Sequence, residues 1–249
     1  MVHTPSGPYP PRARPGDAQR VQTRAAAPGP IRTVTTLVQH SDGSVIESRH
    51  AVPASPFFDG AFCAFARGTL ITTTRGPVAI EDLRPGMRIV TNERGPSPLL
   101  WIGAMSLRPG EAIGAPMRLT RIMTGAFGLG RPMADLMTGP GARMAQRAAG
   151  QPNQMLRPVQ DMIDGNHVIA ITPRSTVQLY HLGLQRHATI TAAGLTLETY
   201  HPGPGFEAAL TPAQLAAFIA LFPHIRRPAD FGSLSHPRAR PSGGTRCVA

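Results

Sequence analysis

Residues 62–103 read FCAFARGTLITTTRGPVAIEDLRPGMRIVTNERGPSPLLWIG, and this stretch decides the fold. Within it, short apolar and β-branched runs alternate with turn residues, such as Thr-Arg-Gly-Pro at 74–77. Similar runs follow further along the chain, in MRLTRIM, HVIAI, TVQLYHLGL and ATITAAGLTLETY. Short strands at a spacing of about ten residues, with turns between them, are typical of a sandwich or a barrel-like sheet. The sequence therefore predicts an all-β domain.

Turn-forming residues are common along the whole chain. Its 249 residues include 27 Pro and 26 Gly, a content that argues against long helices and for short elements joined by turns. One helix is nevertheless predicted near the C-terminus. Thr211 suits its N-cap and Pro212 its first turn, and Gln214 falls on the capping-box position. Pro223 ends the apolar run that follows.

The chain divides into parts of different composition. Both ends are rich in Pro and Arg and poor in bulky aliphatic residues, so they cannot offset the entropy of an ordered chain. Asp42-Gly43 lies between two β-rich runs and predicts a hairpin turn. The predicted division is a disordered tail at 1–30, a short hairpin or linker at 31–57, a β-domain at 58–203, a segment with the C-terminal helix at 204–225, and a second disordered tail at 226–249.

The chain is strongly basic, with a formal net charge of +11, and all 25 of its basic residues are Arg. Such a charge predicts a weak attraction to polyanions, so an Arg-rich polyanion-binding protein is one candidate function. The arginines are spread along the sequence and cluster only in its Pro-rich ends. A compositional preference for Arg over Lys is therefore the simpler interpretation.

Cysteine and histidine usage gives no sign of a cofactor. Cys63 and Cys247 are too few for a disulfide framework, and the nine His show no metal-type spacing with them. We therefore expect neither a metal nor another cofactor. The sequence contains no transmembrane segment and no visible signal peptide, which predicts a cytoplasmic location by default, with non-classical export as the alternative. It identifies no partner, and another protein is one candidate.

The opening stretch resembles the start of bacterial Hedgehog/intein (Hint) domains. Those domains begin with Cys-Phe, continue through Gly-Thr into an apolar strand, and later contain Trp-Ile-Gly. The matching residues are Phe65, Gly68, Thr69, Leu70, Ile71, Ile80, Leu83, Pro85, Gly86, Val90, Trp101, Ile102 and Gly103. Met87 stands where the family usually has an acidic residue. Weaker similarity continues through ADLMTGPGARM, VQDMIDGNHV and LYHLGLQRHATITAAGLTLETYHPG. The resemblance implies a β-horseshoe of short strands over about residues 58–203.

The resemblance also implies a chemistry. In this family the leading Cys attacks the preceding carbonyl and converts the amide into a thioester, while a His from a second block protonates the amine that leaves. Counting back from Gly68, however, Phe65 falls on the family Phe, and the nucleophile position is Ala64. Cys63 lies one residue too early, and a shift of one residue turns a side chain to the opposite face of an extended segment. A local bulge could return the sulfur to the site.

The later blocks depart from the family in the same way. Gly139 stands at the Ser/Thr position, Ala142 at the His position and Gln185 at the Asp position, whereas His187 matches. The resemblance therefore implies a Hint domain without catalysis, which serves as a structural or binding module. The alternative is an autoproteolytic domain in which Cys63, assisted by His187, cleaves the chain before Cys63 by an N–S acyl shift.

Other candidate residues have a simpler structural interpretation. A lone Cys63 among Phe and Ala is typical of an inert buried thiol. His181 and His201, like His187 without a nearby nucleophile, are expected to hold the fold together. Asp164-Gly165 predicts a turn. The remaining predictions are that Trp101 lies in the core, that the Met-rich stretch 117–155 is adaptable core, and that Asp82 and Asp161 have no acid–base partner.

Overall fold

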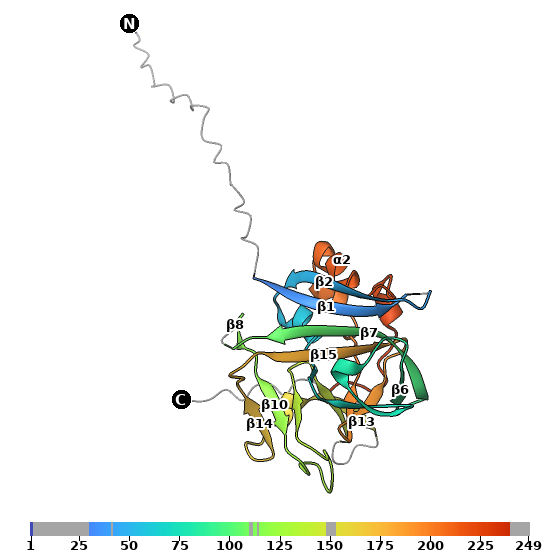
Figure 1. Ribbon diagram of the computed structural model, residues 1–249. Coiled ribbons are helices and arrows are strands. Elements are labelled where there is room, and N and C mark those ends of the chain that lie inside the picture. The colour runs from blue at the N-terminus through green and yellow to red at the C-terminus, as the bar shows by residue number, and fades with distance from the viewer. Residues whose placement is uncertain (2–29, 41, 110–111, 114, 148–152, 240–249) are drawn as a thin grey trace.

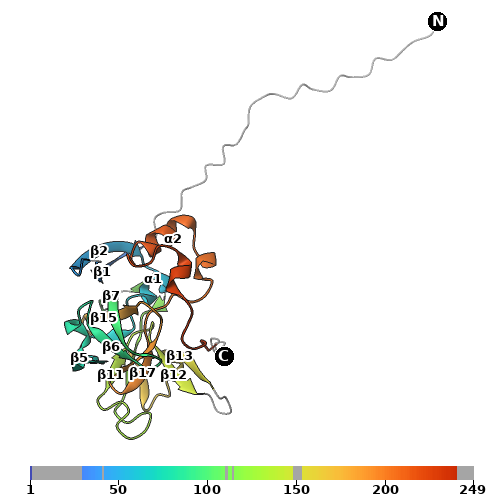
Figure 2. The same cartoon turned by 90° about the vertical axis from the view of Figure 1, so that its right-hand side faces the viewer.

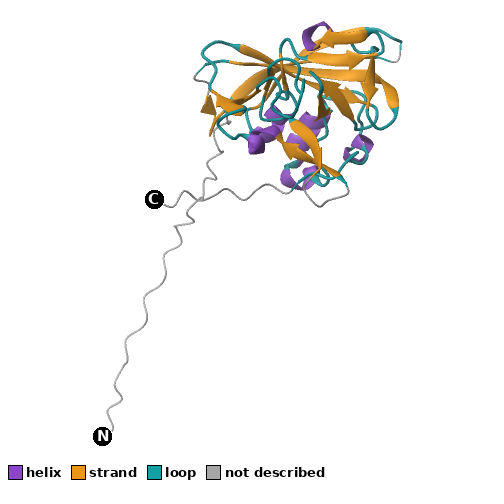
Figure 3. Ribbon diagram, turned by 90° about the horizontal axis from the view of Figure 1, so that it is seen from below, coloured by secondary structure: helices purple, strands orange, loops and turns teal. Residues whose placement is uncertain are grey.

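The computed structural model describes residue 1 and residues 30–40, 42–109, 112–113, 115–147 and 153–239. Antiparallel strands make up most of the regular secondary structure in this part of the chain, with short helices between them (Figure 3), which confirms the all-β prediction. Most of the predicted N-terminal tail at 1–30 and part of the predicted C-terminal tail at 226–249, namely residues 2–29 and 240–249, lie outside the described residues. The strands are β1 (Ile31–Gln39), β2 (Val45–Pro53), β3 (Phe65–Ala66), β4 (Leu70–Thr73), β5 (Gly76–Ala79), β6 (Arg88–Thr91), β7 (Gly95–Leu107), β8 (Ala112–Ile113), β9 (Ala115–Pro116), β10 (Leu119–Ile122), β11 (Leu136–Thr138), β12 (Arg143–Arg147), β13 (Gln154–Pro158), β14 (Val168–Ile171), β15 (Val177–Leu184), β16 (Thr189–Ala192) and β17 (Leu195–Glu198).

Strand β7 connects the two halves of the sheet. It is 13 residues long, pairs with β6 through its first residues and with both β1 and β15 through the rest. On one side the order continues through β4, β16, β17 and β12 to β13, and on the other through β15, β3, β11 and β10 to β14. Figure 1 shows β7 and β15 crossing the middle of the molecule, with β10, β13 and β14 at one end.

The Trp-Ile-Gly motif in β7 has a clear packing role. Trp101 is fully buried, as predicted, and its indole N–H donates to the carbonyl of Leu221 at 2.8 Å. Gly103 is two residues further on and faces the same side of the strand. A Cβ at Gly103 would lie 2.1 Å from the Trp101 ring, so only glycine leaves room for the indole. The motif is therefore part of the core.

The segment before the Hint-like region packs on it. The predicted hairpin is present as β1 and β2, and β1 pairs with β7 from Val34 opposite Met105 to Val38 opposite Trp101. A five-residue helix that the sequence did not predict, α1 (Pro56–Gly60), follows the hairpin, with Ser55 as its N-cap. Residues 31–57 are thus part of the same folded body.

Aromatic side chains join the two ends of the described chain. The predicted C-terminal helix is α2 (Pro212–Ile219), with the expected capping box between Thr211 and Gln214. Figure 2 shows α1 and α2 near each other, beside the hairpin. Phe58 of α1 lies 5.6 Å from Phe218 of α2, measured between ring centroids. The buried cluster that they belong to also contains Phe62, Trp101, Phe206, Phe222 and Phe231.

The structure differs from the sequence prediction after residue 225. The disordered tail was predicted to begin at Arg226, but residues 226–239 make defined contacts, including a 3₁₀ helix η4 (Pro228–Phe231). Phe231 is buried in the aromatic cluster, and Arg238 bonds to a buried carboxylate. These contacts, together with main-chain bonds to β13, hold the segment in place although its composition is that of a disordered chain. Within the described residues, no helix is long and apolar enough to cross a membrane.

Candidate functional site

The peptide between Cys63 and Ala64 lies against the turn that follows β11. The N–H of Gly141 donates to the Cys63 carbonyl at 3.1 Å, and the N–H of Gly139 donates to the Ala64 carbonyl at 2.9 Å. On the other side, the N–H of Ala64 donates to the carbonyl of Tyr180 in β15 at 3.0 Å. The fold therefore brings together the two blocks that the resemblance assigns to a reactive site, and it fixes the 63–64 peptide from both sides.

The family's catalytic positions around this peptide carry no reactive side chain. Ala64 is fully buried, and Ala142, at the family's His position, is 2% exposed. A Cβ at Gly139, the family's Ser/Thr position, would lie only 2.1 Å from the carbonyl oxygen of Cys63. The carbonyl thus occupies the space in which a side chain at 139 would begin.

The sulfur of Cys63 is in a poor setting for a nucleophile. The residue is 1% exposed, and burial raises the pKa of its thiol to about 12. The Gly141 N–H partly offsets this effect, and Asp59 adds to it. A thiol with such a pKa stays protonated at neutral pH, and only the thiolate attacks a carbonyl efficiently.

His187 lies in the loop between β15 and β16, and both of its ring nitrogens are engaged. Nδ1 accepts the backbone N–H of Ser235 at 2.8 Å. Because Nδ1 accepts, Nε2 carries the proton of the neutral ring and donates it to Oε1 of Glu198 at 2.9 Å. The structure therefore gives His187 two partners, neither of which is Cys63.

Glu198, at the end of β17, is the centre of a buried charge network. Its side chain is 2% exposed and accepts hydrogen bonds from His187 and from Nε and Nη2 of Arg238, the latter at 2.7 Å. Arg143 Nε lies 4.0 Å away. Burial would raise the pKa of Glu198, but the His187 hydrogen bond and the Arg238 charge outweigh it and hold the pKa below its usual value. The carboxylate is ionised and well paired.

Sequence reasoning missed this network. It considered Asp82, Asp161 and Asp164 and found an acid–base partner for none of them, whereas the carboxylate that His187 contacts is Glu198. Asp82 and Asp161 lie in the 3₁₀ helices η1 (Ile80–Asp82) and η2 (Val159–Met162). Asp164 accepts three backbone N–H groups, from residues 166–168, in the predicted turn. Only the TLETYHPG resemblance pointed to the region of Glu198, and nothing in the tail's composition singled out Arg238.

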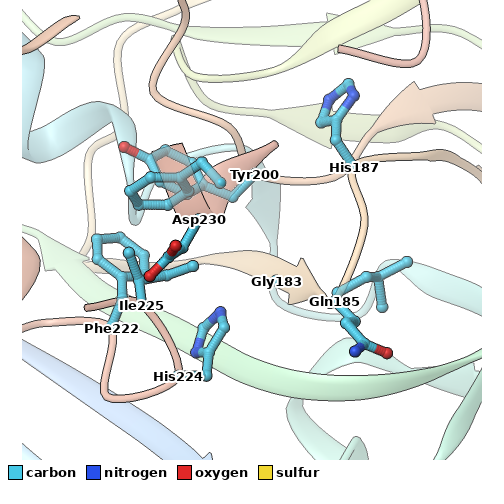
Figure 4. Close-up of a pocket in the computed structure, with 10 residues that line it drawn as sticks. Gly183, Gln185, His187, Tyr200, Phe222, His224, Ile225 and Asp230 are labelled. Carbon is cyan, nitrogen blue, oxygen red and sulfur yellow. The ribbon is translucent and has the colours of Figure 1, made fainter. Parts of the chain in front are cut away.

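Gln185 does not take over the role of the family's Asp. Its side chain points away from the His187 ring, toward the other end of a pocket that His224 and Asp230 also line (Figure 4). Among the described residues, no group of three or more His, Cys, Asp and Glu could hold a metal ion. The site therefore consists of a fixed peptide, a buried thiol and the His187–Glu198–Arg238 network.

Two further histidines act as hydrogen-bonding core residues, in line with the sequence prediction. Burial lowers the pKa of His181 to about 3, and its ring packs edge-on against Phe65 and Tyr200. His201 accepts the N–H of Gly203 at Nδ1, and its Nε2 lies 3.1 Å from the carbonyl of Gly232. Both rings are neutral and serve packing.

Comparison with known families agrees with this geometry. A model described as the Hint domain matches residues 63–204, more than half of the chain. The chain belongs to the Hint domain family. The match begins at Cys63, and it includes Gly139, Ala142 and Glu198 but neither the β1–β2 hairpin nor Arg238. The Hint domain of this chain is thus extended at both ends.

The search of curated proteins found no similar sequence. Among solved structures, the chain is similar to a bacterial intein-like domain from Clostridium thermocellum. The two share 13% sequence identity and a TM-score of 0.41, over 56% of this chain and 99% of that one.

Proposed function

We propose that this protein is a Hint domain that has lost self-cleavage and serves as a structural or binding module. The observation that carries the proposal is the environment of the 63–64 peptide. Gly141 polarises its carbonyl, as a reactive site requires, but the nucleophile and acid positions hold the methyl groups of Ala64 and Ala142. Neither methyl can attack a carbonyl or transfer a proton.

Two further contacts support the proposal. The amide N–H of Ala64, which would become the leaving amine, donates to a carbonyl of the neighbouring strand. The space for a side chain at position 139 is filled by the carbonyl that a family residue there would assist. The surroundings of the peptide have therefore adapted to the absence of the reactive groups.

One observation favours a second candidate, self-cleavage before Cys63. The family match begins at this residue, and the nearby Gly141 N–H lowers the pKa of its thiol against the effect of burial. The thiolate would attack the Phe62 carbonyl to form an S–C bond, the C–N bond would break, and the nitrogen of Cys63 would take up a proton. Attack of water on the resulting thioester would then release the upstream segment as a carboxylic acid and restore the thiol. This route needs a thiolate and an acid, whereas the thiol has a pKa of about 12 and both nitrogens of His187 are engaged.

The reactivity of the Cys63 thiol distinguishes the two candidates. In a Cys247→Ser background, where Cys63 is the single thiol, we expect alkylation by iodoacetamide at pH 8 to be at least about 10³-fold slower in the folded than in the unfolded chain, because a pKa raised from about 8.5 to 12 reduces the thiolate by that factor. The same chain in guanidinium is the control. Rapid alkylation of the folded chain would support the autoproteolytic candidate instead, if the rate rises with pH about a midpoint below pH 8.5.

A further inference from the structure

The last described residues form an isolated parallel β-bridge with the edge of the sheet. β13 is the last strand on its side of the sheet, and its Leu156 bonds with the C-terminal segment on both sides of Arg238. The Leu156 N–H donates to the Pro237 carbonyl at 2.8 Å, and the Ala239 N–H donates to the Leu156 carbonyl at 2.9 Å. Main-chain bonds of this kind are how sheet edges bind extended peptides.

We call residues 235–239, Ser-His-Pro-Arg-Ala, the strap. Its arginine reaches the buried Glu198 with two hydrogen bonds, and Nη2 of Arg238 also donates to the carbonyl of His201 at 2.6 Å. The Arg238 side chain is 19% exposed, so most of it is enclosed by the domain. The pairing of a guanidinium with a buried carboxylate selects arginine strongly over other residues.

The other strap residues are also held by the Hint domain. The Ser235 N–H donates to His187, and the His236 ring lies 3.4 Å from a carboxylate oxygen of Glu93. All these partners lie within the family match, whereas the strap lies outside it. Three elements of the domain thus hold the strap, and together we call them the strap site: the β13 edge for the main chain, Glu198 for an arginine, and His187 for an N–H.

From these contacts we propose that the strap site is a peptide-binding site, which recognises an extended segment with an arginine between a proline and a small residue. The strap is its ligand within the same chain. A segment of the same chemistry, supplied by another molecule, competes for the strap site whenever the strap is released. This inference goes beyond the proposed function, and it holds whether or not the chain cleaves itself.

The test uses the full-length chain and a fluorescent peptide with the sequence of residues 233–239, SLSHPRA. In the wild type the strap competes at an effective concentration in the millimolar range, so the peptide should bind weakly. In the Arg238→Ala variant, fluorescence anisotropy should show binding at least tenfold tighter. The control peptide, in which alanine replaces the arginine, should bind neither chain.

A second variant keeps the test decisive if Arg238→Ala fails to fold, which circular dichroism would report. Ala239→Pro removes the N–H that bonds to Leu156 but retains the arginine, and it should also bind the peptide more tightly than the wild type does. Equal weak binding by the wild type and a folded variant would overturn the proposal. So would binding of the alanine peptide with the same affinity as SLSHPRA.

Discussion

A Gly139→Ala substitution is expected to lower the free energy of unfolding by about 3 kcal/mol. The added Cβ would lie 2.1 Å from the Cys63 carbonyl oxygen and 2.9 Å from its carbon, and backbone atoms cannot rotate away as a side chain can. The 63–64 peptide would have to move against its bonds to Gly141 and Tyr180. Guanidinium denaturation of variant and wild type measures the difference.

Gly60→Ala is the matched control for this prediction. A Cβ at Gly60 would meet nothing within 4 Å, and neither glycine has a positive φ, so the two substitutions differ mainly in the clash. The control should change stability by less than about 0.5 kcal/mol. If Gly139→Ala is as stable as Gly60→Ala, the Cys63 carbonyl does not fill the space at position 139. The filled space would then no longer support the proposal that the site has lost catalysis.

A Glu198→Gln substitution should destabilise the fold by about 3–5 kcal/mol, because it leaves Arg238 and Arg143 near a buried neutral group. Gln has nearly the same shape as Glu, so the loss comes from the charge rather than from packing. The lowered pKa of Glu198 sets the sign of the pH dependence. The ionised Glu198 carboxylate stabilises the fold fully above its unfolded pKa, and this stabilisation is lost as the pH falls through the lower pKa of the folded state. The difference in free energy of unfolding between Glu198→Gln and the wild type should therefore become smaller in acid.

Glu81→Gln provides the comparison for this buried pair. Glu81 also accepts from an arginine, Arg67 at 3.3 Å, but the Arg67 side chain is 69% exposed. Exposed pairs of this kind contribute about 1 kcal/mol or less. Chemical denaturation at pH 7 should therefore separate the two Glu→Gln variants clearly. Equal losses would mean that the charge network around Glu198 is not what holds the C-terminal segment.

The parts of the fold that the sequence predicted depend on local patterns. Apolar runs separated by turns predicted the strands, and Asp42-Gly43 predicted the hairpin. Thr211 and Gln214 predicted the capped helix. Each signal lies within a few residues of the element that it specifies. The resemblance added the family and the juxtaposition of the 63–64 peptide with the turn at 139–142.

The contacts that the sequence did not reveal join distant residues. Glu198 and Arg238 are 40 positions apart, and the arginine lies in a segment whose composition predicts disorder. The buried ion pair, the main-chain bonds to a sheet edge and the contacts of Ser235 and His236 with the domain order such a segment without any local pattern. Likewise, no spacing rule indicated that Glu198, rather than residue 185, would be the carboxylate beside His187.

The pairing of Cys63 with His187 stays a prediction of the autoproteolytic alternative. In the structure the sulfur is buried in the core, and the ring has two partners of its own, Glu198 and Ser235. The loss of catalysis is our proposal, and it concerns chemistry that only a reaction can measure.

Intact-mass measurement of the full-length chain tests that proposal most directly. The protein is incubated near neutral pH with and without hydroxylamine or a thiol, either of which would capture a thioester. We predict the single mass of the uncleaved 249-residue chain, 26.5 kDa, under every condition. A fragment that begins at Cys63, and that disappears in a Cys63→Ala variant, would contradict the account.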